Sequence, residues 1–180
     1  MRSLALLMSL VLLCALTQCK GPDKTSRTSA SFQIPKDLSS LVQSVGVIVV
    51  GKVSGVPAGR TTGEGDARLQ FNDVRITVEK RLKGDAPAEV VVEQLAAAGR
   101  TVTSEVGPRY ERGERYVLFL RSGEGTRYVT STQGRYLLRG GRVWPTEPGL
   151  VAENFKGMDE ARFVGEIQAS VAHSGSSGTH

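Results

Sequence analysis

Cysteine has the clearest chemical potential of any residue type in this sequence. The chain has two cysteines, Cys14 and Cys19, and both lie near the N-terminus. Cys19 follows Leu16-Thr17-Gln18 in a pattern that resembles a bacterial lipobox, where the cysteine is lipid-modified and becomes the mature N-terminus. Gln18 departs from that pattern, because Gly, Ala or Ser usually precedes the cysteine. We predict Cys19 as a lipidation site.

The residues around Cys19 are typical of an exported and anchored protein. Met1-Arg2 is positively charged, and residues 4–16 are apolar and uncharged. This run has the length of a signal-peptide core and is too short to span a bilayer, which needs about 20 helical residues. We predict a signal peptide over residues 1–18, and a lipidated cysteine with a flexible polar tether over residues 19–35. An ordinary secretory signal with an incidental Cys19 is the alternative.

The residue types that usually carry catalysis are scarce beyond Cys19. Without further cysteines, the folded part can form no disulfide, thiol nucleophile or cysteine-bound zinc site. The two histidines, His173 and His180, lie in or beside the C-terminal tail, away from any rigid set of ligands. Glu89 and Glu93 would share one face of a strand, and we interpret them as solvated charges at a rim. We therefore expect no enzymatic activity, no cofactor and no metal site.

Arginine gives the strongest charge signal in the folded part. The chain has 23 Lys and Arg against 18 Asp and Glu, a net charge of +5, and the stretch from Arg100 to Arg142 is locally basic, with nine arginines against four glutamates. Guanidinium groups bind carboxylates, sulfates and phosphates through paired hydrogen bonds. Arginines that point outward from neighbouring strands would form a cationic stripe for an anionic glycan or a lipid headgroup. The candidate ligand-binding residues are Arg115, Arg127, Arg135, Arg139, Arg142 and Trp144.

Strand alternation indicates how these candidates would be oriented. Over residues 135–139, Arg135 and Arg139 fall on one face and Tyr136 and Leu138 on the other. Because Tyr136 and Leu138 are the better core pair, we predict that the arginines point outward. Two questions stay open. The arginines could instead pair with glutamates as a solvated mosaic, and we favour this interpretation. Trp144 could stack with two tyrosines or fill the core, and we favour core filling. The residues concerned are Glu111, Glu114, Glu124, Tyr128 and Tyr136.

Length and composition are those of one modest domain. The chain has 180 residues, of which 39% are hydrophobic and 23% charged. These values exclude a coiled coil, a collagen, a multi-span membrane protein and a wholly disordered chain. We predict one domain over residues 36–173 and a disordered tail over residues 174–180.

Helical periodicity occurs at the two ends of this domain. A short N-terminal helix is predicted where Asp37 can cap an apolar face, and an amphipathic helix is predicted over residues 159–172. The apolar faces consist of Leu38, Leu41, Val42 and Val45 in the first helix, and of Phe163, Val164, Ile167 and Val171 in the second.

The residues between the helices alternate as short strands do. Residues 115–121 are apolar on both faces, so we expect this strand at the centre of a sheet. Gly140-Gly141 is expected to form a two-residue hairpin turn, because glycine accepts positive φ. Residues 57–67 are predicted as a loop, and residues 96–106 are ambiguous. Further strands are predicted over residues 46–56, 69–82, 89–93, 127–132 and 135–139, and from residue 142. This order favours a mainly β fold, an OB-like antiparallel and partly closed β-barrel.

Four pieces of the sequence resemble a known family. They are GVIVVGKVSGV, FNDVRITVEKRLKGD, VVVEQ and VGPRYERGERYVLFL, and they lie between Gly46 and Leu120. Their order is similar to the netrin-like OB-fold domain of the tissue inhibitors of metalloproteinases. Many members of that family have a disulfide-bonded cysteine at the place of Val106, which this chain lacks. The resemblance implies the fold but not inhibition, because the inhibitors chelate zinc through a free N-terminal cysteine and a tether separates Cys19 from the first strand.

These features together predict a membrane-anchored, exported, non-enzymatic lipoprotein that has a binding or structural role in a bacterial cell envelope. The expected partners are a membrane facing the periplasm or the exterior, reached through the lipid on Cys19, and an envelope protein or an anionic glycan. No nucleic-acid partner is expected. The alternative is a binder of anionic glycans or lipid headgroups through the arginine-rich barrel face, and a small hydrolase or protease inhibitor ranks below both.

Overall fold

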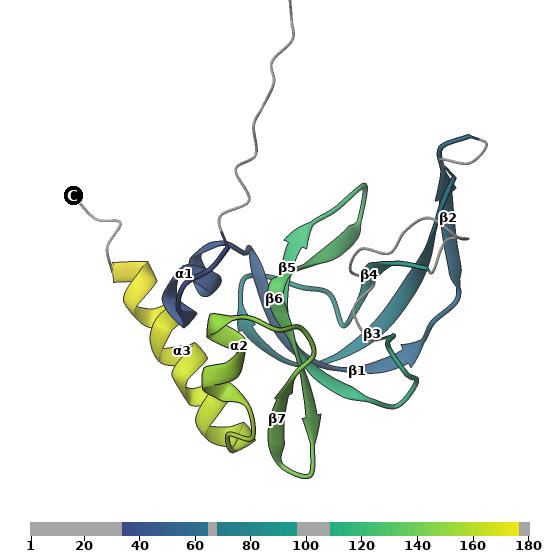
Figure 1. Cartoon of the computed structure of the whole chain (residues 1–180). Helices are drawn as coiled ribbons and strands as arrows, with labels where there is room; N and C mark the ends of the chain where they lie inside the picture. Colours follow the sequence, from purple (N-terminus) through teal and green to yellow (C-terminus); the bar gives the residue numbers. More distant parts are fainter. Residues whose placement is uncertain (1–33, 65–67, 97–108, 177–180) are drawn as a thin grey trace, which may run out of the picture. The chain divides into compact units, whose positions relative to one another are not determined.

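The computed structural model describes residues 34–64, 68–96 and 109–176 (Figure 1). The described residues all belong to one compact unit, Gln33–His180. The predicted signal peptide, Cys19 and nearly all of the ambiguous 96–106 segment lie outside the described residues.

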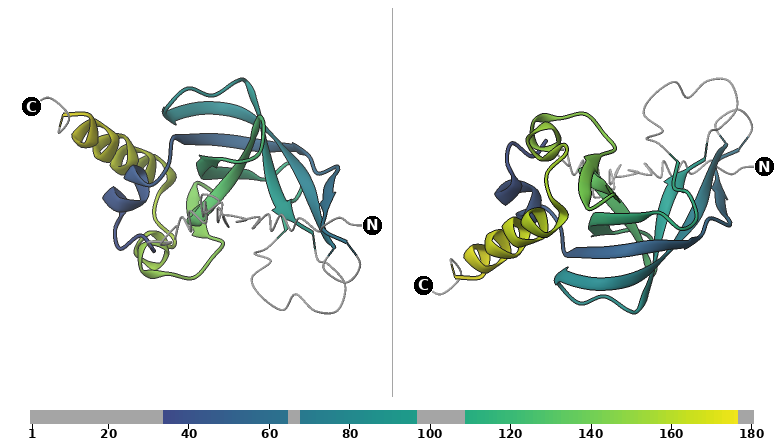
Figure 2. Two further views of the ribbon diagram at one scale, coloured as in Figure 1. Left: turned by 90° about the horizontal axis from the view of Figure 1, so that it is seen from above. Right: turned by 90° about the horizontal axis from the view of Figure 1, so that it is seen from below.

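Seven strands form a single mixed sheet. Its order is β1-β5-β6-β4-β3-β2, with β7 paired to β6. β1 also pairs with β3, so the pairings β1-β3-β4-β6-β5 return to β1. The two views of Figure 2 show β1 running beside β3. The strands are β1 Val47–Gly55, β2 Ala58–Thr62, β3 Leu69–Lys83, β4 Glu89–Leu95, β5 Arg115–Ser122, β6 Arg127–Arg139 and β7 Arg142–Pro145.

The prediction of an antiparallel sheet is wrong for one strand pair. β4 and β6 run parallel, with Val91 opposite Arg127 and Glu93 opposite Val129. Alternation within a strand says which residues share a face, but it says nothing of the direction of the neighbouring strand. The direction of β6 relative to β4 follows from how the chain connects them through β5. The sequence pattern is weakest between β4 and β5, so it could not predict this direction. The mainly β class is confirmed, and the sheet is mixed.

Two hydrophobic clusters lie on opposite faces of this sheet. In β5, Val117 and Phe119 belong to the first cluster, which also contains the helices, while Leu118 and Leu120 belong to the second. β1 alternates in the same way, with Ile48 in the first cluster and the residues on either side of it in the second. The expectation that residues 115–121 form a central strand is confirmed, because β5 lies between β1 and β6 and is buried on both faces.

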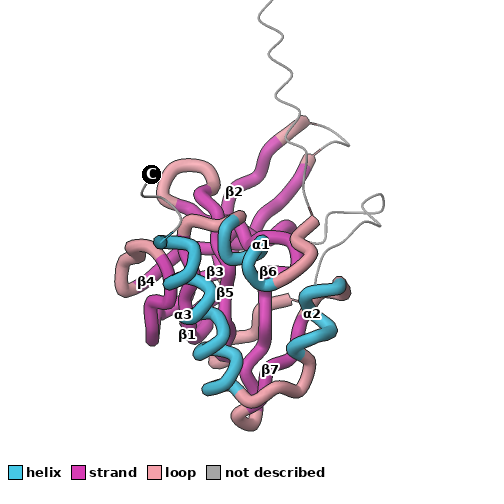
Figure 3. The backbone as a smooth tube through the Cα atoms, turned by 90° about the vertical axis from the view of Figure 1, so that its left-hand side faces the viewer, coloured by secondary structure: helices cyan, strands magenta, loops and turns pink. Residues whose placement is uncertain are grey.

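Three helices, α1 Leu38–Gln43, α2 Leu150–Phe155 and α3 Glu160–Ser176, pack around the first cluster. In Figure 3, which looks from the helix side, they lie in front of the strands. Asp37 caps α1 as predicted, since its side chain accepts a hydrogen bond of 2.7 Å from the Ser40 amide. Phe163 and Ile167 of α3 are fully buried, so its predicted apolar face is also confirmed.

The hairpin turn between β6 and β7 is confirmed as well. Gly140 and Gly141 have φ values of 60° and 70°, which glycine adopts without steric cost. Two elements were missed. β2 lies within the predicted loop, where its short polar sequence gives no strand signal, and α2 has only six residues. α3 continues to Ser176, past the predicted end of the domain at residue 173.

Candidate functional site

The structure places Arg135 in the interior, against our prediction that it points outward. Its residue exposure is 4%. Nε donates a hydrogen bond of 2.7 Å to Thr146 Oγ1, and the guanidinium lies 4.6 Å from the centre of the Tyr110 ring. The prediction assumed one core, on the side of Tyr136. The opposite face of β6 meets the second cluster, which buries Arg135 there.

Arg127 belongs to an ion-pair network that joins four strands. Two of its nitrogens donate to the two oxygens of Asp73 on β3, each at 3.1 Å. On β4, Glu93 lies 2.7 Å from Arg60 Nε and 3.7 Å from Arg127 Nε. Arg60, on β2, also pairs with Glu124 at 3.1 Å. The hydrogen bond to Glu93 raises the pKa of Arg60, and the hydrogen bond to Asp73 raises the pKa of Arg127.

Within this network Glu93 is the most enclosed charge. Its side chain keeps only 6% exposure, because the two arginines cover it. The interpretation of Glu93 as a solvated rim charge is therefore wrong. Glu89, on the same face of β4, is exposed as expected. The strand register explains why the two glutamates differ in exposure. Glu93 lies opposite Asp73, inside the network, whereas Glu89 lies opposite Thr77.

Arg115 links the sheet to α3. Its guanidinium lies 2.8 Å from Glu79 on β3 and 3.1 Å from Glu160 at the start of α3. The hydrogen bond to Glu79 is the largest cause that raises the pKa of Arg115, and the hydrogen bond to Glu160 is the next largest. A cleft of about 530 Å³ lies beside this triad and is lined by residues from the sheet and from α3. Arg115 is thus held by neighbours of opposite charge rather than presented to a ligand.

The last two arginines lie next to the hairpin turn. Arg139 pairs with Glu114 at 3.1 Å, as the favoured mosaic interpretation predicted. Arg142 donates a hydrogen bond of 2.7 Å to the carbonyl oxygen of Gly157. The mosaic interpretation is confirmed only for the Arg139–Glu114 pair. Arg115 and Arg127 pair with carboxylates that were not expected, and Glu93 beside Arg127 is not solvated. In place of Glu111, the sheet supplies Asp73, Glu79 and Glu93.

The aromatic platform does not form. Trp144 is 39% exposed on β7, whereas Tyr136 is fully buried among the phenylalanines of the first cluster. In the register, Trp144 lies opposite Leu137, so its side chain and that of Tyr136 leave the sheet on opposite faces. Core filling, the favoured alternative, is confirmed for Tyr136 but is wrong for Trp144, whose side chain leaves the sheet on the other face and is exposed.

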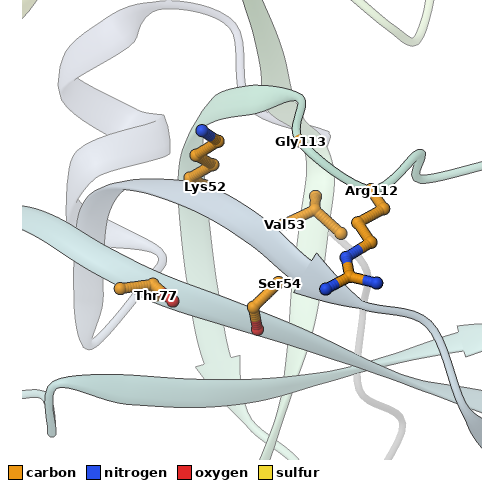
Figure 4. A pocket seen from close by; sticks show the side chains of 6 residues that line it. All are labelled: Lys52, Val53, Ser54, Thr77, Arg112 and Gly113. Atoms are coloured by element: carbon orange, nitrogen blue, oxygen red, sulfur yellow. The ribbon is translucent and has the colours of Figure 1, made fainter.

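A small polar hollow lies on the outer side of β1, where sequence reasoning had named no residue. It has a volume of about 350 Å³ and lies between β1, β3 and the turn before β5 (Figure 4). Its lining residues are Lys52, Val53, Ser54, Thr77, Arg112 and Gly113. The charge of Lys52 between Gly51 and Val53 could have indicated that its side chain points outward, but nothing local brings Arg112 beside it.

Two classes of site were also sought among the described residues. Residues 34–64, 68–96 and 109–176 contain no group of three or more His, Cys, Asp or Glu side chains placed to hold a metal ion. In the same ranges, no helix has the length and apolar character needed to cross a membrane. His173 is exposed on α3, where Nδ1 lies 2.6 Å from the carbonyl oxygen of Ala169.

Comparison with known proteins returned no relative. No protein-family model matches the chain, and no curated protein is significantly similar to it in sequence.

Proposed function

We propose that this chain is an exported lipoprotein, anchored to a bacterial envelope membrane through Cys19, whose folded part is a non-enzymatic binding domain. The observation that carries the proposal is the order of segments along the chain. A short apolar run, a lipobox-like cysteine and a polar tether precede a compact unit that begins at Gln33 and contains no cysteine. A lipid on Cys19 would hold that unit near a membrane without a spanning helix.

We also infer an OB-like fold. The strand pairings run β1-β3-β4-β6-β5 and return to β1, and β2 extends β3 outside this ring. A ring of five strands with helices beside it is what the resemblance to the netrin-like domain implies. The distinctive GERYVLFL piece supplies β5, the strand that is buried on both faces. OB-like domains mostly bind other molecules on their surfaces, which supports a binding role.

The arrangement of charge supports a non-enzymatic role. Several described carboxylates, Glu93, Asp73 and Glu160 among them, face arginines that balance their charge. Acid–base catalysis uses carboxylates that converge on an open site. The alternative function, anion binding by an arginine-rich face, loses support because Arg135 is buried and three of the other arginines are paired with carboxylates.

The test of anchoring is the single substitution Cys19→Ala in the full-length chain. Acyl chains stabilise membrane attachment by about 0.8 kcal/mol for each buried CH₂ group. We expect the variant to lose incorporation of labelled fatty acid, and to leave the detergent phase or accumulate as an unprocessed precursor. Cys14→Ala is the matched control and should be processed and labelled like the wild type. Equal labelling of Cys19→Ala and wild type would refute the proposal.

A further inference from the structure

Two cations beside the hollow on β1 lack the carboxylate partners that four arginines of the domain have. Lys52 and Arg112 both have exposed side chains, and neither forms an ion pair or a side-chain hydrogen bond within the part of the chain that the structure describes. Arg60, Arg115, Arg127 and Arg139 are each paired with a carboxylate. The guanidinium and the ammonium are therefore available to a ligand of opposite charge.

The backbone around the hollow is fixed. The Val53 amide donates a hydrogen bond of 2.9 Å to the carbonyl oxygen of Glu114, and the Gly113 amide donates one of 2.9 Å to that of Val53. These bonds hold the turn that carries Arg112 against β1. Figure 4 shows the Arg112 guanidinium pointing down toward β1 beside Val53, with Lys52 on the other side of the turn. In Figure 4 the Lys52 ammonium points up toward the turn, so the two cations line the hollow from different elements.

Hydroxyl groups complete the lining. Thr77 is exposed on β3 opposite Lys52, and its hydroxyl makes no hydrogen bond among the described residues. Ser54 Oγ lies 3.2 Å from the carbonyl oxygen of Arg75 and 3.3 Å from Glu89 Oε2. Glu89 on β4 lies opposite Thr77 and accepts the Ser54 hydrogen bond, so its negative charge borders the hollow on the β4 side. A bound anion would lie on the side of Lys52, Thr77 and Arg112.

We infer that this hollow binds the phosphate group of a small ligand, with Lys52 and Arg112 as its charged contacts and Thr77 as a hydrogen-bond donor. Guanidinium binds phosphate through two parallel hydrogen bonds, and an ammonium adds a point charge. The volume lies in the lower part of the range for small-molecule sites. The hollow is open and polar, so charge should dominate the affinity, which should fall as salt is raised. The inference rests on the proposed binding function and names its ligand class.

The experiment uses the full-length chain in a neutral detergent at low salt, titrated by calorimetry. One probe is glycerol phosphate, a phosphomonoester, and the other is glycerophosphoglycerol, the phosphodiester headgroup of an anionic lipid. Saturable binding of the diester assigns a lipid headgroup as the source, and saturable binding of the monoester alone assigns a soluble phosphate. Both results support the site. An absence of saturable binding of either probe would overturn it.

Two double variants separate a site from general attraction. Lys52→Glu/Arg112→Glu should weaken binding by about tenfold or more, because two charge-assisted contacts are replaced by repulsion. Lys36→Glu/Arg162→Glu changes the net charge equally at exposed cations that do not line the hollow, and it should bind as the wild type does. Equal losses in both would overturn the inference.

A third variant distinguishes a loss of charge from misfolding as the cause of weaker binding. Lys52→Arg/Arg112→Lys keeps both charges and moves the guanidinium to the other side of the hollow, so it should retain binding to within a few fold if charge dominates the affinity. Loss of binding here with an unchanged thermal transition would also contradict the assigned contacts. The titration is done in detergent solution and does not depend on the lipid at Cys19. If neither probe binds, the anchoring proposal still stands. If the Cys19 test fails, the phosphate-binding inference can still be tested by the titration.

Discussion

At the residue scale, several arginines of this domain connect elements through carboxylates and so are not available to a ligand. Arg60 and Arg127 bring β2 and β6 to Glu93 on β4, and Arg115 brings α3 to the sheet. A single exposed ion pair contributes little to stability, but a network around an enclosed carboxylate contributes more, because its partners are partly desolvated. Glu93 is the residue on which such a contribution depends.

We predict that Glu93→Gln lowers the free energy of unfolding by about 1–2 kcal/mol. Loss of a fully buried partner costs about 3–5 kcal/mol, but Arg60 and Arg127 are about one-third exposed and keep Glu124 and Asp73 as partners. The matched control is Glu89→Gln, an exposed glutamate on the same face of β4, with an expected change within about 0.5 kcal/mol. Urea unfolding of both variants measures the difference. Equal effects would mean that the network does not stabilise the fold.

At the element scale, the helices act as a cover for one face of the sheet. The strand residues of the first cluster are as apolar as those of the second cluster. These apolar side chains would be exposed to water if α1, α2 and α3 did not pack on them. Phe163 of α3 is central to this packing. Its ring centre lies 4.8 Å from that of Tyr136 on β6 and 4.9 Å from that of Phe155 on α2.

Phe163→Ala should therefore destabilise the domain by about 3–5 kcal/mol, the usual cost of removing a fully buried aromatic ring. Leu150→Ala offers the comparison, because Leu150 is apolar and helical but 74% exposed. We expect that variant to change stability by less than about 0.5 kcal/mol. The measurement is the denaturant midpoint with an unchanged slope. A small loss for Phe163→Ala would show that α3 is not needed to cover the sheet.

At the scale of the whole folded unit, the return of the strand pairings to β1 is the defining feature. β1 has partners on both sides, whereas β2 pairs with β3 alone among the described strands. The described core relies on packing and pairing alone, because both cysteines lie before it in the chain. Strands with two partners and two buried faces should open only when the whole unit unfolds, while an edge strand opens locally.

Hydrogen exchange should separate these strands. We expect the amides of Val49 and Val117, which are fully buried on β1 and β5, to exchange only through global unfolding. The amide of Thr61 on β2 should exchange at least about tenfold faster, through local opening. The protected amides should also show the same dependence on added denaturant as equilibrium unfolding does. Exchange of Val49 at the rate of Thr61 would contradict the pairing of β1 with two neighbours.

Sequence alone determined the features that depend on neighbouring residues. The Asp37 cap, the apolar face with Phe163 and the glycines of the β6–β7 turn were predictable, because caps, helical periodicity and positive φ act within a few residues. The central position of residues 115–121 also followed from sequence, since a strand that is apolar on both faces must be covered on both.

Only the tertiary structure decided which charges meet and which are buried. Arg135 is interior because the second cluster covers its side of β6, and no pattern within residues 135–139 contains that information. Glu93 differs from Glu89 because Arg60 and Arg127 reach it from strands distant in sequence. The parallel pairing of β4 with β6, and the approach of Arg112 to Lys52, likewise depend on how distant segments pack. Long-range contacts of this kind arise from the packing of the whole chain, so local periodicity cannot report them.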